Sequence, residues 1–242
     1  MRTILRRLLA SAAASLLASP VLICMAHAAD IGSHPLPPPR APVLVPFFTW
    51  NGFYAGINAG YGFGTSKWTN TVTGVSTGNF DVEGALAGGT AGYNLQLGGY
   101  VLGIEGDIGW NFAIGSTTSG SNQGSAVPGC GTTCETASDW LGTLRGRLGY
   151  ALDRFLPYVT GGASFGNIEG TAASGGSFSK TAIGWTAGGG LEYAFLNNWS
   201  AKVEYLYVDL GTATCGAACS GGSPFDVTYT TQIVRGGLNY KF

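Results

Sequence analysis

The stretch that decides the fold is Thr228-Tyr229-Thr230-Thr231-Gln232-Ile233-Val234-Arg235-Gly236-Gly237-Leu238-Asn239-Tyr240-Lys241-Phe242. Taken in twos from its end, one set of positions is apolar or small: Phe242, Tyr240, Leu238, Gly236 and Val234. The alternate set is polar or small: Lys241, Asn239, Gly237 and Arg235. Successive side chains of a β-strand point to opposite faces. The stretch therefore predicts a strand with one apolar and one polar face.

The composition narrows the class of protein. Only 10% of the 242 residues are charged, whereas a soluble domain carries about 25%. The net charge of -1 gives no sign of a nucleic-acid partner. The 41 glycines follow no collagen period, and they suit a wall that bends tightly or packs closely. A small, strongly curved barrel is one fold that uses so many.

The first 48 residues divide into two segments. Residues 1–28 predict a cleaved signal peptide, because arginines precede an apolar run that ends in Ala26-His27-Ala28. A membrane anchor is the rival interpretation, but no stop-transfer charges follow the run. Residues 29–48 are rich in proline and predict an extended periplasmic tether, with a recognition segment as the alternative. The mature protein is expected to be exported.

From residue 49 onward the sequence alternates in short runs. Seven runs precede the terminal strand: Asn51–Gly64, Ala85–Gln96, Tyr100–Asn111, Trp140–Tyr150, Pro157–Phe165, Ile183–Phe195 and Trp199–Tyr207. Short turns separate some of them, at Leu97–Gly99, Leu152–Arg154 and Leu196–Asn198. Long polar stretches separate the others, at Thr65–Val82, Ala113–Ser138, Asn167–Lys180 and Asp209–Asp226. Strict alternation of long loops with tight turns is typical of outer-membrane barrels. Residues 49–242 thus predict an all-β, eight-stranded antiparallel up-and-down transmembrane barrel with both termini on the periplasmic side.

A soluble eight-stranded barrel such as a lipocalin is the main alternative for this pattern. Its polar face would meet water and carry many Lys and Glu side chains, but here that face is mostly Gly, Thr, Ser and Asn. The aromatic residues also gather at strand ends, as in the two girdles that mark membrane interfaces. One group lies toward the short turns: Phe53, Tyr93, Tyr100, Tyr150, Tyr193, Trp199 and Tyr240. The other lies toward the long loops: Tyr61, Trp110, Trp140, Trp185 and Tyr207. The apolar face is therefore expected to contact lipid.

The charged side chains of the strands are then expected to point into the lumen. Four are acidic and four basic: Glu105, Asp107, Glu192, Glu204, Arg145, Arg147, Lys202 and Arg235. Glu105 and Asp107 face the strand of Arg145 and Arg147, so cross-strand ion pairs are predicted. We favour a structural plug, because eight strands enclose a space that side chains can fill. A gate or selectivity filter in a narrow pore is the alternative.

Catalytic and cofactor signals are weak. Gly162-Ala163-Ser164-Phe165-Gly166 matches the nucleophile-elbow pattern, but the only histidines are His27 and His34, outside the predicted barrel. No enzyme activity, cofactor or metal site is predicted. Cys130, Cys134, Cys215 and Cys219 lie in two of the long polar stretches. Exported cysteines in even number favour disulfides over zinc, here Cys130–Cys134 and Cys215–Cys219, with pairing between the two stretches as the alternative.

Three stretches carry a resemblance to a known family: Phe48–Gly56, Lys202–Gly211 and Val234–Phe242, together with the Pro-rich lead-in. They resemble the porin-like outer-membrane β-barrel family of alphaproteobacteria, its surface antigens, and more distantly the transmembrane domain of OmpA. The resemblance implies an integral outer-membrane protein with outer-membrane lipid as its surroundings. It also implies that the last strand, with Tyr240 and Phe242, is an assembly signal read by the barrel-assembly machinery.

Three functional interpretations remain open at this point. The first is a structural and surface role in envelope integrity and in the display of exposed loops. The second is a narrow porin for small solutes, and the third is binding of a ligand such as haem, or of a host surface, by the loops. The residues do not decide among them and leave the oligomeric state open.

Overall fold

The computed structural model describes residues 48–118, 133–172, 176–216 and 224–242. Eight strands occur in these ranges: β1 (Gly52–Asn70), β2 (Ser76–Leu97), β3 (Tyr100–Thr118), β4 (Thr133–Tyr150), β5 (Phe155–Ala172), β6 (Gly176–Ala194), β7 (Trp199–Cys215) and β8 (Phe225–Lys241). No helix among the described residues is long and apolar enough to cross a membrane. The predicted signal peptide and the predicted tether up to residue 47 lie outside the described residues and stay predictions.

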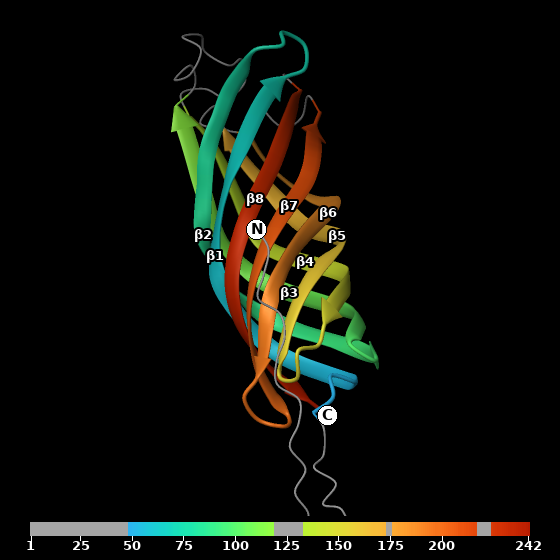
Figure 1. Cartoon of the computed structure of the whole chain (residues 1–242). Helices are drawn as coiled ribbons and strands as arrows, with labels where there is room; N and C mark the ends of the chain where they lie inside the picture. The colour runs from blue at the N-terminus through green and yellow to red at the C-terminus, as the bar shows by residue number, and fades with distance from the viewer. Residues whose placement is uncertain (1–47, 119–132, 173–175, 217–223) are drawn as a thin grey trace, which may run out of the picture. The chain divides into compact units, whose positions relative to one another are not determined.

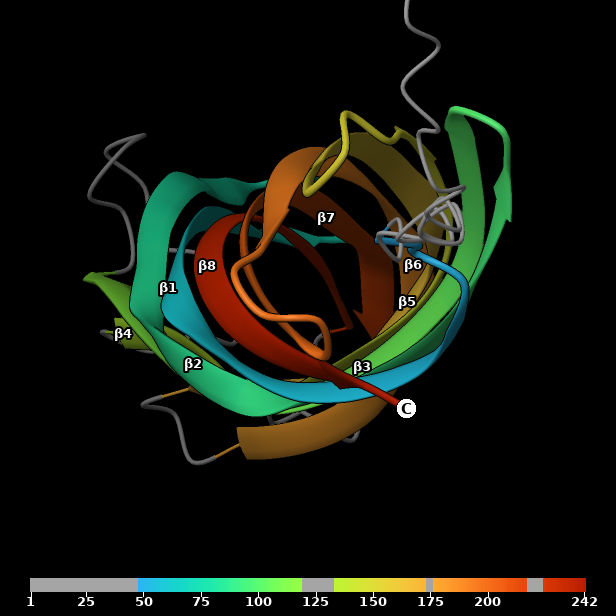
Figure 2. The same ribbon diagram turned by 60° about the horizontal axis from the view of Figure 1, so that its bottom comes forward.

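The eight described strands form one closed, antiparallel, up-and-down barrel, as the sequence predicted (Figure 1). Each strand pairs with its neighbours in the chain, and β1 closes the ring by pairing with β8 from Tyr54↔Lys241 to Asn70↔Phe225. Figure 2 shows the strands running around this ring, with the C-terminus at the near end. We call the end with the three short turns and the C-terminus the turn end, and the opposite end the loop end.

The strands reach farther toward the loop end than the sequence predicted. Residues 65–82 were expected to form a loop, but they complete β1, turn at residues 71–75 and begin β2. The Asn70 side chain holds this turn, because its Oδ1 accepts hydrogen bonds from the backbone N–H groups of Val72 and Thr73, each at 2.9 Å. The expectation of four long loops is therefore corrected: much of that polar sequence is strand.

The polarity of the strands inverts partway along the barrel, which explains why these extensions looked like loops. In the turn-end half of β8, Val234, Leu238 and Tyr240 point outward and Arg235 and Asn239 point inward. In the loop-end half the inward side chains are apolar: Phe225, Val227, Tyr229 and Ile233. The alternate positions there are polar: Asp226, Thr228, Thr230 and Gln232. The outward side chains are therefore apolar toward the turn end, which suits lipid, and polar toward the loop end, which suits water.

Cross-strand aromatic pairs stabilise the barrel at the turn end. Their ring centroids lie 4.5–5.4 Å apart in Phe53–Tyr93, Tyr100–Tyr150, Phe155–Tyr193 and Trp199–Tyr240. Each pair joins two strands that the chain itself connects only at the loop end. Such pairs contribute about 0.5–1.5 kcal/mol beyond the burial of their area. The aromatic residues predicted at the turn end, to which the structure adds Phe155, therefore also hold neighbouring strands together.

Glycines on the inner wall make room for large side chains in a narrow barrel. A Cβ atom at Gly92 would collide with the phenol of Tyr54, and one at Gly190 would meet the phenol of Tyr158 at 2.8 Å. Each tyrosine comes from the strand beside its glycine. The high glycine content therefore lets bulky polar groups lie flat against the inner wall.

Candidate functional site

The interior of the barrel contains all eight charged residues that the sequence singled out. Their side chains are nearly inaccessible to solvent, with at most 4% of any side-chain surface exposed. They come from β3, β4, β6, β7 and β8, so the group spans the lumen rather than following one wall. Other charged residues point outward on the loop-end wall, including Lys67, Asp81 and Glu83. The expectation that all strand charges point inward therefore holds for the turn-end half of the barrel and not for the loop-end wall.

Arg145 lies at the centre of the buried network. Its Nη2 is 2.5 Å from Glu105 Oε1 and 2.7 Å from Asp107 Oδ2, and its Nη1 is 2.9 Å from Glu204 Oε1. Glu105 is directly opposite Arg145 on the neighbouring strand, as the cross-strand argument expected. Glu204 comes from β7, which does not pair with β4. The fixed fork of donors in a guanidinium group suits such a junction of three carboxylates.

The remaining charges extend the network in both directions. Arg235 contacts Glu204 at 2.7 Å and Asp107 at 2.9 Å, while Lys202 Nζ lies 2.8 Å from Glu105 Oε2. Nearer the turn end, Arg147 pairs with Glu192. Glu192 also accepts hydrogen bonds from Ser200 and Asn239, at 2.5 and 2.9 Å. Four acids and four bases therefore share ion pairs, so no net charge is left in a region where an unpaired charge is costly.

Two buried tyrosines belong to the same network, and sequence reasoning did not select them. Tyr54 donates a hydrogen bond to Glu105 at 2.8 Å, and Tyr158 donates one to Glu204 at 3.0 Å. The guanidinium carbon of Arg147 lies 3.7 Å from the centre of the Tyr158 ring. Both tyrosines stand on the polar face of their strands. An aromatic hydroxyl on an inward polar face needs a partner, and this signal would have found them.

An apolar layer fills the lumen on the loop-end side of the ion pairs. It consists of Trp68, Phe80, Val82, Leu86, Leu141, Ile168, Ala182, Leu206, Val208, Leu210, Ala213, Phe225, Val227, Tyr229 and Ile233. In β7 the layer begins at Leu206, two residues beyond Glu204, and in β8 it begins at Ile233, two residues beyond Arg235. The inner face of the predicted strands was expected to be hydrophilic, and this layer corrects that expectation for the loop-end half.

One polar tie crosses the apolar layer. Trp68 Nε1 donates a hydrogen bond to Thr136 Oγ1 at 2.8 Å, and the Thr136 hydroxyl lies 3.0 Å from that of Ser66. Ser66 and Trp68 belong to β1 and Thr136 to β4, which do not pair with each other. The tie therefore joins two strands that no ladder connects and satisfies the indole N–H within the apolar layer.

A second apolar cluster closes the turn end. Trp50, Val101, Leu156 and Ala194 are buried together, with Phe48 and Ala151 packed against them. Trp50 is fixed by two hydrogen bonds, from its backbone N–H to Gln96 Oε1 at 2.8 Å and from Nε1 to the Asp153 carbonyl at 3.1 Å. The segment that precedes β1 thus folds into the mouth of the barrel.

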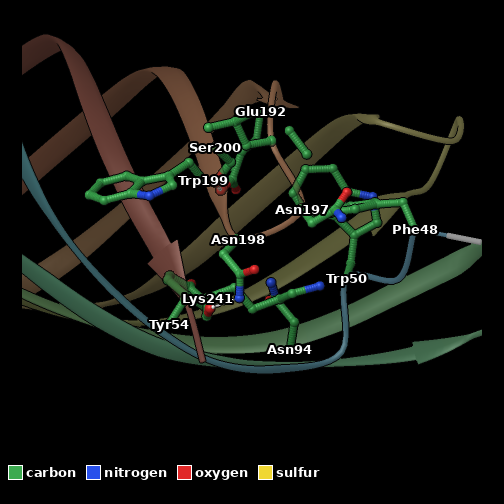
Figure 3. A pocket seen from close by; sticks show the side chains of 12 residues that line it. Phe48, Trp50, Tyr54, Asn94, Glu192, Asn197, Asn198, Trp199, Ser200 and Lys241 are labelled. Atoms are coloured by element: carbon green, nitrogen blue, oxygen red, sulfur yellow. Dashed lines mark hydrogen bonds between the residues drawn. The ribbon is translucent and has the colours of Figure 1, made fainter. Parts of the chain in front are cut away.

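Figure 3 shows the pocket beside this segment. The Phe48 ring packs edge-on against Trp50 with centroids 5.0 Å apart, and Lys241 Nζ lies 4.4 Å from the centre of the Phe48 ring. A cavity of about 20 Å³ remains between these groups and Glu192. That volume holds about one water molecule. The mouth is therefore filled, and the sequence signal for it is the tryptophan immediately before the first alternating run.

The other sequence candidates are less informative in the structure. Ser164 of the nucleophile-elbow match is fully buried in β5. No group of three or more His, Cys, Asp or Glu side chains suited to a metal ion occurs among the described residues. Cys130 and Cys219 lie outside those residues, and for Cys134 and Cys215 only the backbone is described. The predicted disulfides stay predictions.

Comparison with known proteins adds the family. A family model described as an outer membrane protein beta-barrel domain matches residues 40–242. The 31 kDa outer-membrane immunogenic protein of Brucella melitensis biotype 1 is 40% identical over 234 residues, which cover 90% of this chain and 93% of that protein. The 22 kDa outer membrane protein of Rhizobium leguminosarum bv. viciae is 31% identical over 206 residues, covering 84% and 82%.

A solved structure, Neisserial surface protein A, is similar at 16% identity and a TM-score of 0.42, covering 79% of this chain and 97% of that one. The family match covers every described strand. Both named relatives are outer-membrane proteins, and the match to this chain extends over most of their length. The protein is thus an outer-membrane protein, with lipid around its outward apolar face. By the extent of the family match and of its relatives, the chain belongs to the outer membrane protein beta-barrel domain family.

Proposed function

We propose that the protein is a sealed barrel with a structural and surface role in the outer membrane. One observation carries this proposal: three successive layers fill the described lumen. The apolar cluster around Trp50 lies at the turn end, the eight-residue ion network follows, and the apolar layer from Leu206 upward lies at the loop end. A hydrated path would need to cross two apolar fillings. The sequence predicted a plug of ion pairs alone, and the two apolar layers bring the number of filling layers to three.

The relatives support a surface role. The relatives from Brucella are named outer-membrane immunogenic proteins, and from that name we infer that part of this chain is exposed at the cell surface. The outward side chains of the loop-end wall are polar, including Lys67, Asp81 and Thr228, so this part of the barrel suits water outside the membrane. The turn around Val72, whose side chain is exposed, is the described tip of this wall. Proteolysis or antibody labelling of intact cells at this tip measures the exposure directly.

We further propose that the barrel has no catalytic activity. Ser164 has no histidine in the barrel to activate it, and its side chain is closed off from solvent. A nucleophile needs an adjacent base and access to its substrate. An esterase assay with a soluble aryl ester, comparing the refolded protein with Ser164→Ala, should show no difference between them.

Single-channel recording decides between the sealed barrel and the narrow porin. The protein without residues 1–28 is refolded, its folding is checked by heat-modifiable gel mobility, and it is inserted into a planar bilayer. We expect no discrete steps, while a general porin added afterwards to the same bilayer should give them. Reproducible steps from the folded protein would overturn the sealed lumen. They would make Glu105, Asp107, Arg145 and Arg147 candidates for a gate.

A further inference from the structure

The ladder between β6 and β7 is the shortest in the described barrel. It runs from Trp185↔Asp209 to Ala194↔Ser200 and then stops. Both strands continue toward the loop end, but each is paired on one side only: residues 176–184 of β6 with β5, and residues 212–215 of β7 with β8. Among the described residues, the facing edges of these two segments have no ladder partner. We call the gap between them the β6–β7 wedge.

A bulge at Gly211 opens the wedge. Gly211 has a φ of 69°, and its N–H donates a hydrogen bond of 2.7 Å to Asp209 Oδ1 rather than to a strand neighbour. The register between β7 and β8 shifts at the same place, between Asp209 and Thr212. A bulge bends its strand and increases the local twist. Here it lets β7 remain paired with β8 while it turns away from β6.

The Lys180 side chain spans the wedge from β6 to β7. Continuing the register of Trp185↔Asp209 toward the loop end places Lys180 opposite Thr214. No backbone pair forms there, and the Lys180 Nζ instead donates a hydrogen bond of 3.2 Å to the Thr214 carbonyl. Lys180 follows the same inward register as the buried Ala182 and Thr186, yet its side chain is exposed. An exposed side chain at an inward position indicates that the wall is open at this height.

The chemistry of the wedge suits a peptide strand. An unpaired strand edge presents a row of free N–H and C=O groups, which another extended chain can pair with. The β6 side, Gly176-Ser177-Phe178-Ser179-Lys180-Thr181-Ala182-Ile183-Gly184, contains no proline that would remove a donor. Its single charge is Lys180. Antiparallel self-pairing centred on this lysine would bring two like charges together, which disfavours a second copy as the occupant.

We propose that the β6–β7 wedge is a β-augmentation site. It accepts an extended, proline-free strand of another polypeptide, which pairs with residues 176–184 and places a carboxylate opposite Lys180. This carboxylate replaces the Thr214 carbonyl as the partner of the ammonium group, a stronger charge-assisted bond. The inference goes beyond the structural role and does not depend on whether the lumen conducts.

A binding experiment with a defined probe tests the proposal. The refolded protein in lipid nanodiscs is titrated against a fluorescent nine-residue strand peptide, acetyl-TVTVEVTVT-amide, and binding is followed by anisotropy. We expect saturable binding that is lost when every second amide of the peptide is methylated. Lys180→Glu should weaken binding of this peptide at least tenfold and should favour the peptide whose central Glu is replaced by Lys. Lys67→Glu, an exposed lysine on β1, is the matched control and should leave binding unchanged.

Several outcomes would overturn the proposal. Absence of saturable binding, equal binding of the methylated peptide, or no response to Lys180→Glu would each exclude it. Hydrogen exchange of the free protein provides an independent readout. If both alternate sets of amides in residues 176–184 are already protected, the chain itself fills the wedge. If protection appears only as protein concentration rises, the occupant is a second copy.

Discussion

Arg145 and Glu204 meet across the barrel from two strands that do not pair, with Nη1 and Oε1 2.9 Å apart and both side chains fully buried. The contact joins two strands that no backbone ladder connects. Arg145 also joins two carboxylates of the adjacent β3, so one guanidinium group links three strands. The stability of the barrel should therefore depend strongly on this one side chain.

Arg145→Leu should destabilise the barrel by about 3–5 kcal/mol, because Glu105, Asp107 and Glu204 then lose a shared buried partner. Arg145→Lys should cost less, since it keeps the charge but not the fork of donors. Urea unfolding in lipid vesicles, followed by tryptophan fluorescence, measures both. Arg154→Ala, which removes an arginine from a turn, is the control and should change the free energy of unfolding by about 1 kcal/mol or less. Equal costs for Arg145→Leu and Arg154→Ala would contradict the central role of Arg145.

Removing one acid and one base together should leave the barrel closed, even though Glu105 also contacts Arg145 and Arg147. In the double variant Lys202→Met with Glu105→Gln, one base and one acid are lost together, so the charge balance of the network is kept. Replacement of a whole buried pair by neutral groups is often close to neutral for stability. We expect folded protein and silent bilayers, because the apolar layers remain. Steps in this variant, with none in the unsubstituted protein, would show that the ion pairs are the seal.

The sequence predicted the fold well because eight runs with strand periodicity follow one another from residue 49 onward, and the resemblance at Phe48–Gly56 and Val234–Phe242 added the family. It also selected the eight lumen charges, since each lies on the polar face of its strand. The loop-end halves were missed for a physical reason. There the interior becomes apolar and the exterior polar, so residues such as Thr228 and Thr230 are strand positions with the composition of a loop. The wedge was missed because only the position of Gly211, and not its conformation, is visible in a sequence.

Gly162→Ala should be strongly destabilising, whereas Gly146→Ala should not. A Cβ at Gly162 would overlap the Leu144 carbonyl oxygen and lie 2.7 Å from Arg145 Cα, so backbone must move. At Gly146, which lies on the outward side of β4, a Cβ would come no closer than 3.8 Å, to the Gly161 carbonyl oxygen. Overpacking of this kind costs about 1–3 kcal/mol, and we expect the upper part of that range. Urea unfolding of the two variants side by side checks it, and similar midpoints would refute the close packing at Gly162.

Trp50→Ala should loosen the turn end without dissolving the barrel. It removes a buried indole and its hydrogen bond to the Asp153 carbonyl, which should cost about 3 kcal/mol. Phe53→Ala is the control, because that aromatic ring is largely exposed on the outer wall only three residues away. Hydrogen exchange should show faster exchange around Val101 and Leu156 in the first variant alone. Unchanged exchange there would mean that the segment before β1 does not close the mouth.

Phe242→Ala separates assembly in the cell from stability of the finished barrel. The Phe242 ring is 76% exposed, and its main ordered contact is an edge-on packing against Tyr240, with centroids 5.3 Å apart. The backbone bond from Phe242 N–H to the Phe53 carbonyl does not require the ring. Loss of the ring should therefore change the free energy of unfolding by about 1 kcal/mol at most.

If the ring is read by the assembly machinery, the amount of folded protein in the outer membrane should nevertheless fall several-fold. Phe155→Ala, another exposed girdle aromatic that pairs with Tyr193, is the control and should reach the membrane normally. Equal outer-membrane levels for the two variants, measured by immunoblot of membrane fractions at matched expression, would remove the role of Phe242 as an assembly signal.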